Sequence, residues 1–281
     1  MRCLKCNIPI KSTSDQVIII PMGDIHLGYV GVDEKKLDGF VEFIRTTPNV
    51  RWIGMGDYIE AINLSDARFD PSGVAKWCRD SLDDLVKTQS DYFIKKIWPI
   101  RDKCLGLLAG NHEDVIRRKY HVDVMGHIGV ETKIPILSSV AMLHVQFSIG
   151  RKSQSVKIFA MHGYGGCRTE SASLNKILNK GKEFDADVYL MGHDHFLISQ
   201  TKTQIVMSGG DNPRAIEQKR IFAVTGSFRL AYCESKYSDY AERQAYPPVR
   251  TGCHKITVTP FRHTKIERQD VTLRPDIHIS E

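Results

Sequence analysis

Residues 17–26 read Val17-Ile18-Ile19-Ile20-Pro21-Met22-Gly23-Asp24-Ile25-His26. A short apolar run rich in β-branched residues is typical of a buried strand. Two side chains that can bind a metal, Asp24 and His26, follow this run at once. The stretch therefore predicts a strand that delivers polar groups to its own carboxyl end.

The same arrangement recurs four times further along the chain. The apolar runs are 52–55, 105–109, 156–161 and 188–191, followed respectively by Gly56-Asp57, Gly110-Asn111-His112-Glu113, His162-Gly163 and Gly192-His193-Asp194-His195. In open α/β sheets, ligands bind beyond the carboxyl ends of the strands. If these strands lie side by side, we expect their polar side chains to converge.

The spacing of apolar residues between the runs predicts helices. These are expected over 37–44 with Asp33 as a cap, over 82–93, and over 174–178 with Ser171 or Ser173 as a cap. Strands that alternate with helices indicate an α/β protein. After residue 195 the pattern changes to strands with little helix between them, at 197–206, 220–225, 254–260 and 265–273.

The composition is that of an ordinary globular protein. The chain has 281 residues, 42% of them hydrophobic, and a formal net charge of +6. A mild excess of basic residues suits a polyanionic partner such as nucleic acid, although many proteins without one share it. Seven scattered cysteines argue against a secreted disulfide scaffold and favour reduced thiols in a cytoplasm. No apolar run is long enough for a signal peptide or a membrane span, and the sequence leaves the oligomeric state open.

Residues 1–15 are polar and contain Cys3-x-x-Cys6. We expect them to form an extension outside the core, followed by one domain over 16–281. The pair could be half of a zinc knuckle. Because no second C-x-x-C follows it, ordinary thiols in a mobile tail are the favoured interpretation.

The residues at the strand ends form a set of nitrogen and oxygen ligands without a thiolate. The set comprises Asp24, His26, Asp57, Asn111, His162, His193 and His195. Such ligands suit two divalent ions, Mn first and Fe, Zn, Co or Ni as alternatives. Seven ligands are too many for one ordinary transition-metal site but fit two ions that share a bridging carboxylate.

The five motifs, taken in order, resemble the calcineurin-like metallophosphoesterase superfamily. That family's pattern is D-x-H, G-D-x-x-D, G-N-H-[DE], a lone histidine and G-H-x-H, and the resemblance covers roughly residues 17–230. It implies a two-sheet α/β/β/α sandwich, with a metallophosphoesterase domain over 16–281 that hydrolyses phosphate esters at a two-metal site. It also implies roles for the ligands: Asp24, His26 and His195 on one metal, Asn111, His162 and His193 on the other, and Asp57 as the bridge.

The resemblance implies catalytic roles for His112 and Glu60. His112 matches the family's non-ligand histidine, which donates a proton to the leaving oxygen or stabilises charge on the phosphate. Glu60 stands where the family often has an aspartate that orients this histidine. Glu60 is one methylene longer, and we expect its side chain to reach His112.

Two further resemblances bear on the substrate. Asp24-Ile25-His26-Leu27-Gly28 is similar to the D-x-H-L-G opening of double-strand-break repair nucleases, and 226–248 resembles phage and prophage phosphoesterases. They imply a phosphodiesterase or nuclease acting on DNA or RNA, in a host cytoplasm if the chain is phage-encoded. A small-nucleotide phosphodiesterase or a phosphomonoesterase is the alternative. A non-catalytic metal-containing scaffold module is disfavoured, because such relatives usually lose a ligand or the non-ligand histidine.

Three arginines are candidate phosphate contacts. Arg117 and Arg118 follow the Asn111 motif, and Arg168 ends a loop with three glycines after His162. The alternative for each is a solvated surface position. The histidines without matching context, which we expect to be structural or exposed, are His121, His127, His144, His254, His263 and His278.

Overall fold

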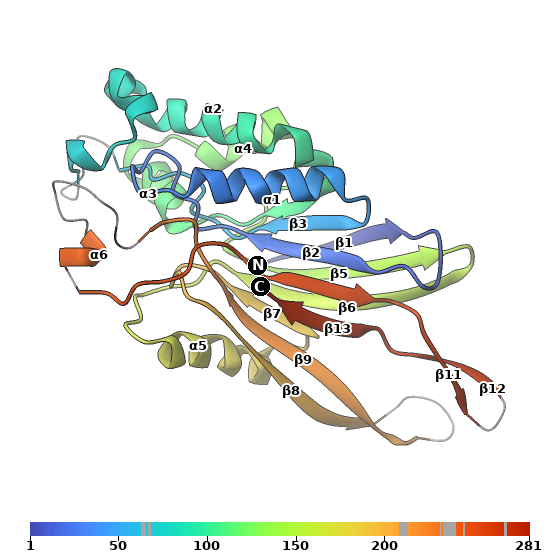
Figure 1. Ribbon diagram of the computed structural model, residues 1–281. Helices are drawn as coiled ribbons and strands as arrows, with labels where there is room; N and C mark the ends of the chain where they lie inside the picture. Colours follow the sequence, from blue (N-terminus) through green and yellow to red (C-terminus); the bar gives the residue numbers. More distant parts are fainter. Residues whose placement is uncertain are drawn as a thin grey trace.

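The computed structural model describes residues 1–62, 66, 69–207, 213–230, 232, 240–243, 245–266 and 269–281. Two sheets lie against each other at its centre, and helices cover their outer faces (Figure 1). The expected α/β class and the two-sheet α/β/β/α sandwich are confirmed. The phage-like segment 226–248 is described only in part, because 231, 233–239 and 244 lie outside these ranges.

The first sheet has six strands in the order β1-β5-β6-β7-β9-β8. They are β1 (Arg2–Pro9), β5 (Val140–Ile149), β6 (Lys152–Met161), β7 (Val188–Met191), β9 (Ala215–Thr225) and β8 (Leu197–Met207). The second sheet has five strands in the order β13-β10-β2-β3-β4. They are β13 (Asp276–Ser280), β10 (Lys255–Thr259), β2 (Val17–Met22), β3 (Val50–Gly54) and β4 (Cys104–Leu107). Within these sheets, β2, β3 and β4 run parallel to one another, as do β6, β7 and β9.

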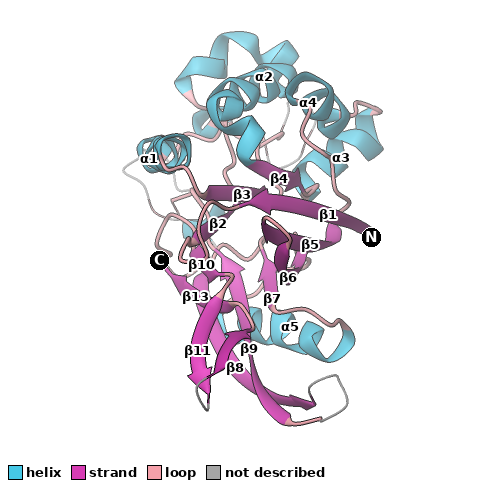
Figure 2. Cartoon of the chain, turned by 90° about the vertical axis from the view of Figure 1, so that its right-hand side faces the viewer, coloured by secondary structure: helices cyan, strands magenta, loops and turns pink. Residues whose placement is uncertain are grey.

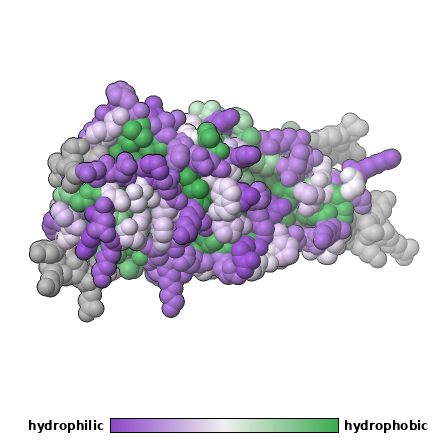
Figure 3. Space-filling view, turned by 90° about the horizontal axis from the view of Figure 1, so that it is seen from above, coloured by the Kyte–Doolittle hydropathy of each residue, from purple (hydrophilic) through white to green (hydrophobic). Residues whose placement is uncertain are grey.

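The helices divide between the two outer faces. Figure 2 shows α1 to α4 on one side of the strands and α5 on the other. Their bounds are α1 (Glu34–Thr46), α2 (Leu85–Ile97), α3 (Asn111–Tyr120), α4 (Val124–Thr132), α5 (Glu170–Glu183) and the short α6 (Tyr240–Arg243), with 3₁₀ turns at Pro71–Gly73, Lys76–Asp84 and Trp98–Lys103. Over the face seen in Figure 3 hydrophilic side chains predominate, as expected for the solvent side of this helical layer. Among the described residues, no helix is both long and apolar enough to cross a membrane.

Three apolar layers hold the sandwich together. Successive residues of a strand point to opposite faces, so Ile19 of β2 packs between the sheets with Leu190 of β7. Its neighbour Ile20 points outward and belongs to the same core as Leu37 of α1. The third core lies beneath α5 and contains Ile177. Strands buried on both faces explain why the sequence runs are continuously apolar instead of alternating.

Of the two helix caps expected from the sequence, one is confirmed and one is wrong. Asp33 caps α1 by accepting a backbone N–H from the first turn. The expected cap of α5 at Ser171 or Ser173 is wrong, because Thr169 takes that position and Ser173 is buried within the helix. The strand expected over 265–273 is instead the hairpin of β11 (Arg262–Ile266) and β12 (Gln269–Leu273), and β5 was not expected at all.

The expectation that residues 1–15 form an extension outside the core is wrong. Residues 2–9 are β1, which pairs in parallel with β5 at the edge of the six-stranded sheet. Burial alternates along the strand: Leu4, Cys6 and Ile8 face inward, whereas their neighbours are exposed. Ile8 is only 2% exposed and Ile10 only 6%. The segment is polar on average, and this average concealed the alternation of inward-facing and exposed residues.

The same geometry bears on the two N-terminal cysteines. Cys3 is exposed and Cys6 is partly buried, and both are free thiols. Side chains three residues apart on a strand point to opposite faces. Cys3 and Cys6 therefore cannot hold one metal ion together within this strand.

We predict that Ile8→Ala will lower the free energy of unfolding by about 2–5 kcal/mol, because it leaves a cavity in a close-packed core. Lys5→Ala is the control, since Lys5 is exposed on the same strand and its replacement should cost less than about 0.5 kcal/mol. Chemical denaturation of both variants measures the difference. Equal, small losses would mean that β1 contributes little to the core.

Candidate metal centre

All seven expected ligands lie just beyond the carboxyl ends of strands. Those of the five-stranded sheet are Asp24 and His26 after β2, Asp57 after β3, and Asn111 after β4. Those of the six-stranded sheet are His162 after β6, and His193 and His195 after β7. The centre is therefore built where the two sheets meet, from segments up to 171 residues apart in sequence (Asp24 to His195).

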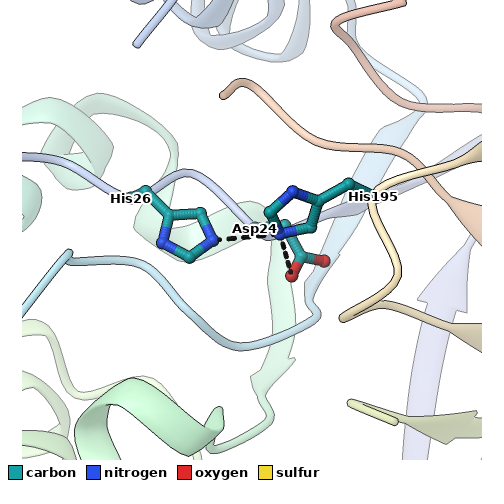
Figure 4. Close-up of side chains that lie close together, drawn as sticks. All are labelled: Asp24, His26 and His195. Carbon is teal, nitrogen blue, oxygen red and sulfur yellow. Dashed lines mark hydrogen bonds and ion pairs between the residues drawn. The ribbon is translucent and has the colours of Figure 1, made fainter. Parts of the chain in front are cut away.

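Asp24, His26 and His195 form the first cluster, in which the potential ligand atoms lie within 4.8 Å of one another. The Nε2 atoms of His26 and His195 are 3.2 Å apart, and Nε2 of His195 lies 3.5 Å from Oδ1 of Asp24 (Figure 4). Asp24 and His26 are buried.

Asp57, His162 and His193 form the second cluster, again with ligand atoms within 4.8 Å. Nε2 of His162 lies 3.3 Å from Oδ2 of Asp57 and 3.0 Å from Oδ1 of Asn111. Oδ2 of Asp57 is also 4.0 Å from Nε2 of His26 in the first cluster. Asp57 is therefore the carboxylate that lies between the two groups.

The backbone is strained at five of the seven ligands. Positive φ angles occur at Asp24 (47°), His26 (56°), Asp57 (50°), His193 (70°) and His195 (63°). This left-handed conformation costs a non-glycine residue about 1–2 kcal/mol, and such strain gathers at functional sites. Local hydrogen bonds maintain it: the backbone N–H of His193 donates to the Asp24 carboxylate at 2.9 Å, and that of Asp24 donates to the Gly56 carbonyl.

Glu113 fixes the loop that carries Asp57, a role that the sequence did not reveal. This buried carboxylate accepts backbone N–H groups from Asp57 (3.2 Å), Tyr58 (2.6 Å) and Ile59 (3.3 Å) after β3, and from Gly110 (3.1 Å) after β4. The only available signal was its place at the end of Gly110-Asn111-His112-Glu113.

The buried charge at Asp57 requires a positive partner. Burial acts to raise the pKa of Asp57, but His162 and His112 hold it well below its usual range. Burial acts to lower the pKa of His162, yet Asp57 raises it to about 10. A proton on His162 thus compensates the carboxylate, and a divalent cation among the same side chains would do so too.

The other histidines are suited to bind metal directly. Burial lowers the pKa of His26, His193 and His195, so these imidazoles are neutral, which is the form that coordinates metals. Nδ1 of His193 is buried and has no hydrogen-bond partner in the part of the chain that the structure describes. Such an unsatisfied atom costs about 1–3 kcal/mol, and a metal ion would satisfy it. The clustered histidines and aspartates fit metal ions.

His112 lies beside these two clusters and forms a third group of potential ligands with His26 and Glu60, whose ligand atoms lie within 4.8 Å of one another. Its backbone N–H donates to Oδ1 of Asp57 at 3.0 Å, its Nδ1 contacts the backbone carbonyl of Glu60, and its Nε2 is 4.0 Å from Oδ2 of Asp57. Burial acts to lower the pKa of His112, but Asp57 and Glu60 raise it above the ordinary value. These charges favour the protonated form of His112, which is the form that can donate a proton.

The Glu60 side chain comes near His112, as expected, because the ligand atoms of Glu60, His112 and His26 lie within 4.8 Å of one another. Its described hydrogen bond goes elsewhere: Oε2 of Glu60 accepts from Nδ1 of His26 at 2.8 Å, whereas His112 contacts the backbone carbonyl of Glu60. Arg229, which the sequence gave no reason to select, lies 3.6 Å from the other carboxylate oxygen. Burial acts to raise the pKa of Glu60, but Arg229 and His26 lower it to about 2.

The three candidate phosphate contacts lie outside both clusters. Arg117 and Arg118 on α3 each pair with Asp114, at 2.7 and 2.8 Å, and both are largely exposed. The guanidinium of Arg168 lies 5.9 Å from the ring centroid of Tyr246.

Comparison with known proteins yields only weak similarities. No family model matches the chain, and no curated protein matches it significantly. Among solved structures it is similar to Vps29 of Entamoeba histolytica complexed with Zn²⁺ (13% identity over 94% of this chain and 99% of that one, TM-score 0.35). It is also similar to a metallophosphoesterase of Sphaerobacter thermophilus (12% identity over 94% of this chain and 89% of that one, TM-score 0.34). A third similar structure is an uncharacterised protein of Streptococcus pneumoniae described as a predicted phosphoesterase (13% identity over 95% of this chain and 99% of that one, TM-score 0.32). Similarity this weak leaves the function to be argued from the centre itself.

We predict that Gly110→Ala will abolish metal binding. A Cβ at Gly110 would lie 2.1 Å from Oδ1 of Asp57 and 2.2 Å from its backbone nitrogen, so the carboxylate must move. Gly39→Ala on the exposed side of α1 is the control: its Cβ meets nothing within 4 Å, and the change should stabilise the helix by roughly 0.5–1 kcal/mol. Elemental analysis of the purified variants, with circular dichroism to confirm folding, measures the outcome. Normal metal content in Gly110→Ala would show that this packing does not position Asp57.

Proposed function

We propose that the chain is a metal-dependent hydrolase of phosphate esters and a member of the calcineurin-like metallophosphoesterase superfamily. One observation carries the proposal: two clusters of mostly buried potential ligands meet at Asp57, and His112 lies beside Asp57 outside these two clusters. The order of the five motifs in the sequence supports the same function.

Two divalent ions would occupy the centre, with Mn the best candidate. We assign Asp24, His26 and His195 to one ion, Asn111, His162 and His193 to the other, and Asp57 to both. Bound there, the ions would lower the pKa of a water molecule and neutralise the charge of a phosphate.

His112 would serve the leaving oxygen. Its Nδ1 is occupied by the Glu60 carbonyl, so the proton available for transfer is the one on Nε2, beside Asp57. It also lies in the first turn of α3, whose backbone N–H groups carry a partial positive charge. A helix N-terminus in this position favours a bound phosphate.

The favoured substrate is a phosphodiester of DNA or RNA. The net charge of +6 and the Asp24-Ile25-His26-Leu27-Gly28 stretch support it. Among the contacts described, Arg117 and Arg118 share one acidic partner, Asp114. The part of α3 that carries the two arginines therefore keeps a net positive charge, which would attract a polyanion. Arg168 belongs to the loop after His162 and is a second proposed contact.

The proposal is tested with Mn²⁺-loaded protein on bis-p-nitrophenyl phosphate, on p-nitrophenyl phosphate, on small cyclic nucleotides, and on DNA and RNA. Turnover of the diester and of nucleic acid would support it in full. Preference for the monoester would indicate a phosphatase instead, and cleavage of small cyclic nucleotides alone a nucleotide phosphodiesterase. Bound metal without any turnover would point to a scaffold module.

We predict that Asp57→Asn will weaken both metal sites together, because the bridging charge is shared. Metal content after dialysis should fall from two ions towards none. Asp114→Asn is the matched control, since Asp114 binds only the arginines of α3 among the contacts described and should leave the metal content unchanged. Loss of a single ion from Asp57→Asn would show that Asp57 belongs to one site only.

We predict that His112→Ala will keep both metals and lower turnover by about 10²–10⁴, the usual range for general acid–base assistance. The deficit should be largest for a sugar hydroxyl, which needs a proton as the bond breaks. It should be smaller for p-nitrophenolate, which leaves readily without one. Comparison of kcat on both substrates, together with metal analysis, measures the effect, and loss of metal in proportion to activity would make His112 a ligand.

A further inference from the structure

Glu60 contacts both His26 and His112, through different atoms. Its carboxylate oxygen Oε2 accepts from Nδ1 of His26 at 2.8 Å, and its backbone carbonyl accepts from Nδ1 of His112. Its own N–H donates to the carbonyl of Leu27 at 2.9 Å, one residue beyond His26. Glu60 is therefore tied by side chain and backbone to the segment that carries a first-cluster ligand.

Arg229 lies against the oxygen of Glu60 that His26 does not use. Its Nη1 is 3.6 Å from Oε1, and its guanidinium carbon lies 4.2 Å from the ring centroid of Tyr29. The side chain is only 16% exposed. The backbone N–H of Arg229 donates to Oγ of Ser227, which in turn donates to the carbonyl of Asp24. Arg229 is thus held to the same segment from a second direction.

These contacts determine which ring nitrogen of each histidine carries hydrogen. An ionised carboxylate and a backbone carbonyl are both acceptors only, so Nδ1 carries a hydrogen in both rings, and any further proton on His112 is held at Nε2. Nε2 of His26 then points without hydrogen at His195 and Asp57. Partners of this kind orient a metal-binding histidine and increase its basicity. Arg229 supplies the charge that a buried carboxylate needs.

We propose that Arg229 and Glu60 act as one positioning unit, in which Arg229 holds the Glu60 carboxylate and Glu60 fixes the orientation of His26 and His112. The unit connects a ligand of the first cluster to the group that would protonate the leaving oxygen. The effect of this unit on turnover rests on the proposed function, whereas its effect on the orientation of His26 does not.

The test uses Arg229→Met, Glu60→Leu, their combination and Glu60→Gln. Arg220→Met is the matched control, because Arg220 is also largely buried (13% exposed) but pairs with Asp185. Nitrogen-15 NMR of the histidine rings in metal-free protein reports the tautomer of His26. Equilibrium titration with Mn²⁺ alone reports affinity, and steady-state kinetics separate kcat from KM.

The wild type and Glu60→Gln should show a single Nδ1-protonated His26, since an amide oxygen still accepts the hydrogen bond. Arg229→Met and Glu60→Leu should show mixed tautomers and bind Mn²⁺ about 10–100-fold more weakly, the usual cost of losing such a partner. Adding Arg229→Met to Glu60→Leu should cost little more, because coupled residues are not additive. The affected variants should lose kcat more than KM.

An unchanged His26 tautomer in both Arg229→Met and Glu60→Leu would overturn the proposal, as would fully additive losses. Equal losses in Arg220→Met would also overturn it, because they would reflect general destabilisation. If Glu60→Leu does not fold, the decision falls on Arg229→Met and Glu60→Gln. If the wild type hydrolyses phosphate esters but the His26 tautomer is unaltered in the variants, only the positioning unit is refuted. If the tautomers change as expected but the wild type hydrolyses no phosphate ester, only the proposed function is refuted.

Discussion

The carboxylate of Asp57 is the group on which the geometry of the centre depends. Oδ1 accepts the backbone N–H of His112, and Oδ2 faces Nε2 of His162. The carbonyl of the same residue accepts the N–H groups of Ile25 and His26. One residue therefore joins the ends of β2, β3 and β4 to the end of β6 in the opposite sheet. A shift of Asp57 would move ligands that lie far apart in sequence.

The convergence of the ligands gathers energetically costly groups at the centre. Five ligands have left-handed backbones, buried carboxylates lie close together, and Nδ1 of His193 is buried without a described partner. Strained or unsatisfied groups persist only where the surrounding structure determines them fully. Here the apolar core between the two sheets and the two cores on their outer faces provide that support, and Glu113 joins the loops after β3 and β4.

Two largely buried ion pairs neighbour the ligands. Arg229 pairs with Glu60, which contacts His26, and Lys176 of α5 pairs at 3.0 Å with Asp194, the residue between His193 and His195 in sequence. Lys176 also donates to the carbonyls of the glycine-rich loop after His162. In each case a basic side chain holds an acidic one that neighbours the ligands.

The sequence by itself determined the fold class and the residues that meet at the centre, because buried parallel strands require continuous apolar runs and their polar ends must lie at one edge. It did not determine β1, whose polar average concealed inward-facing Ile8 and Ile10. Nor did it assign Glu113 and Arg229, whose partners are brought near only by folding. The partner of Glu60 was decided by tertiary structure too: its carboxylate accepts from His26, and its backbone carbonyl accepts from His112. Side-chain direction depends on neighbours distant in sequence, and no local pattern records them.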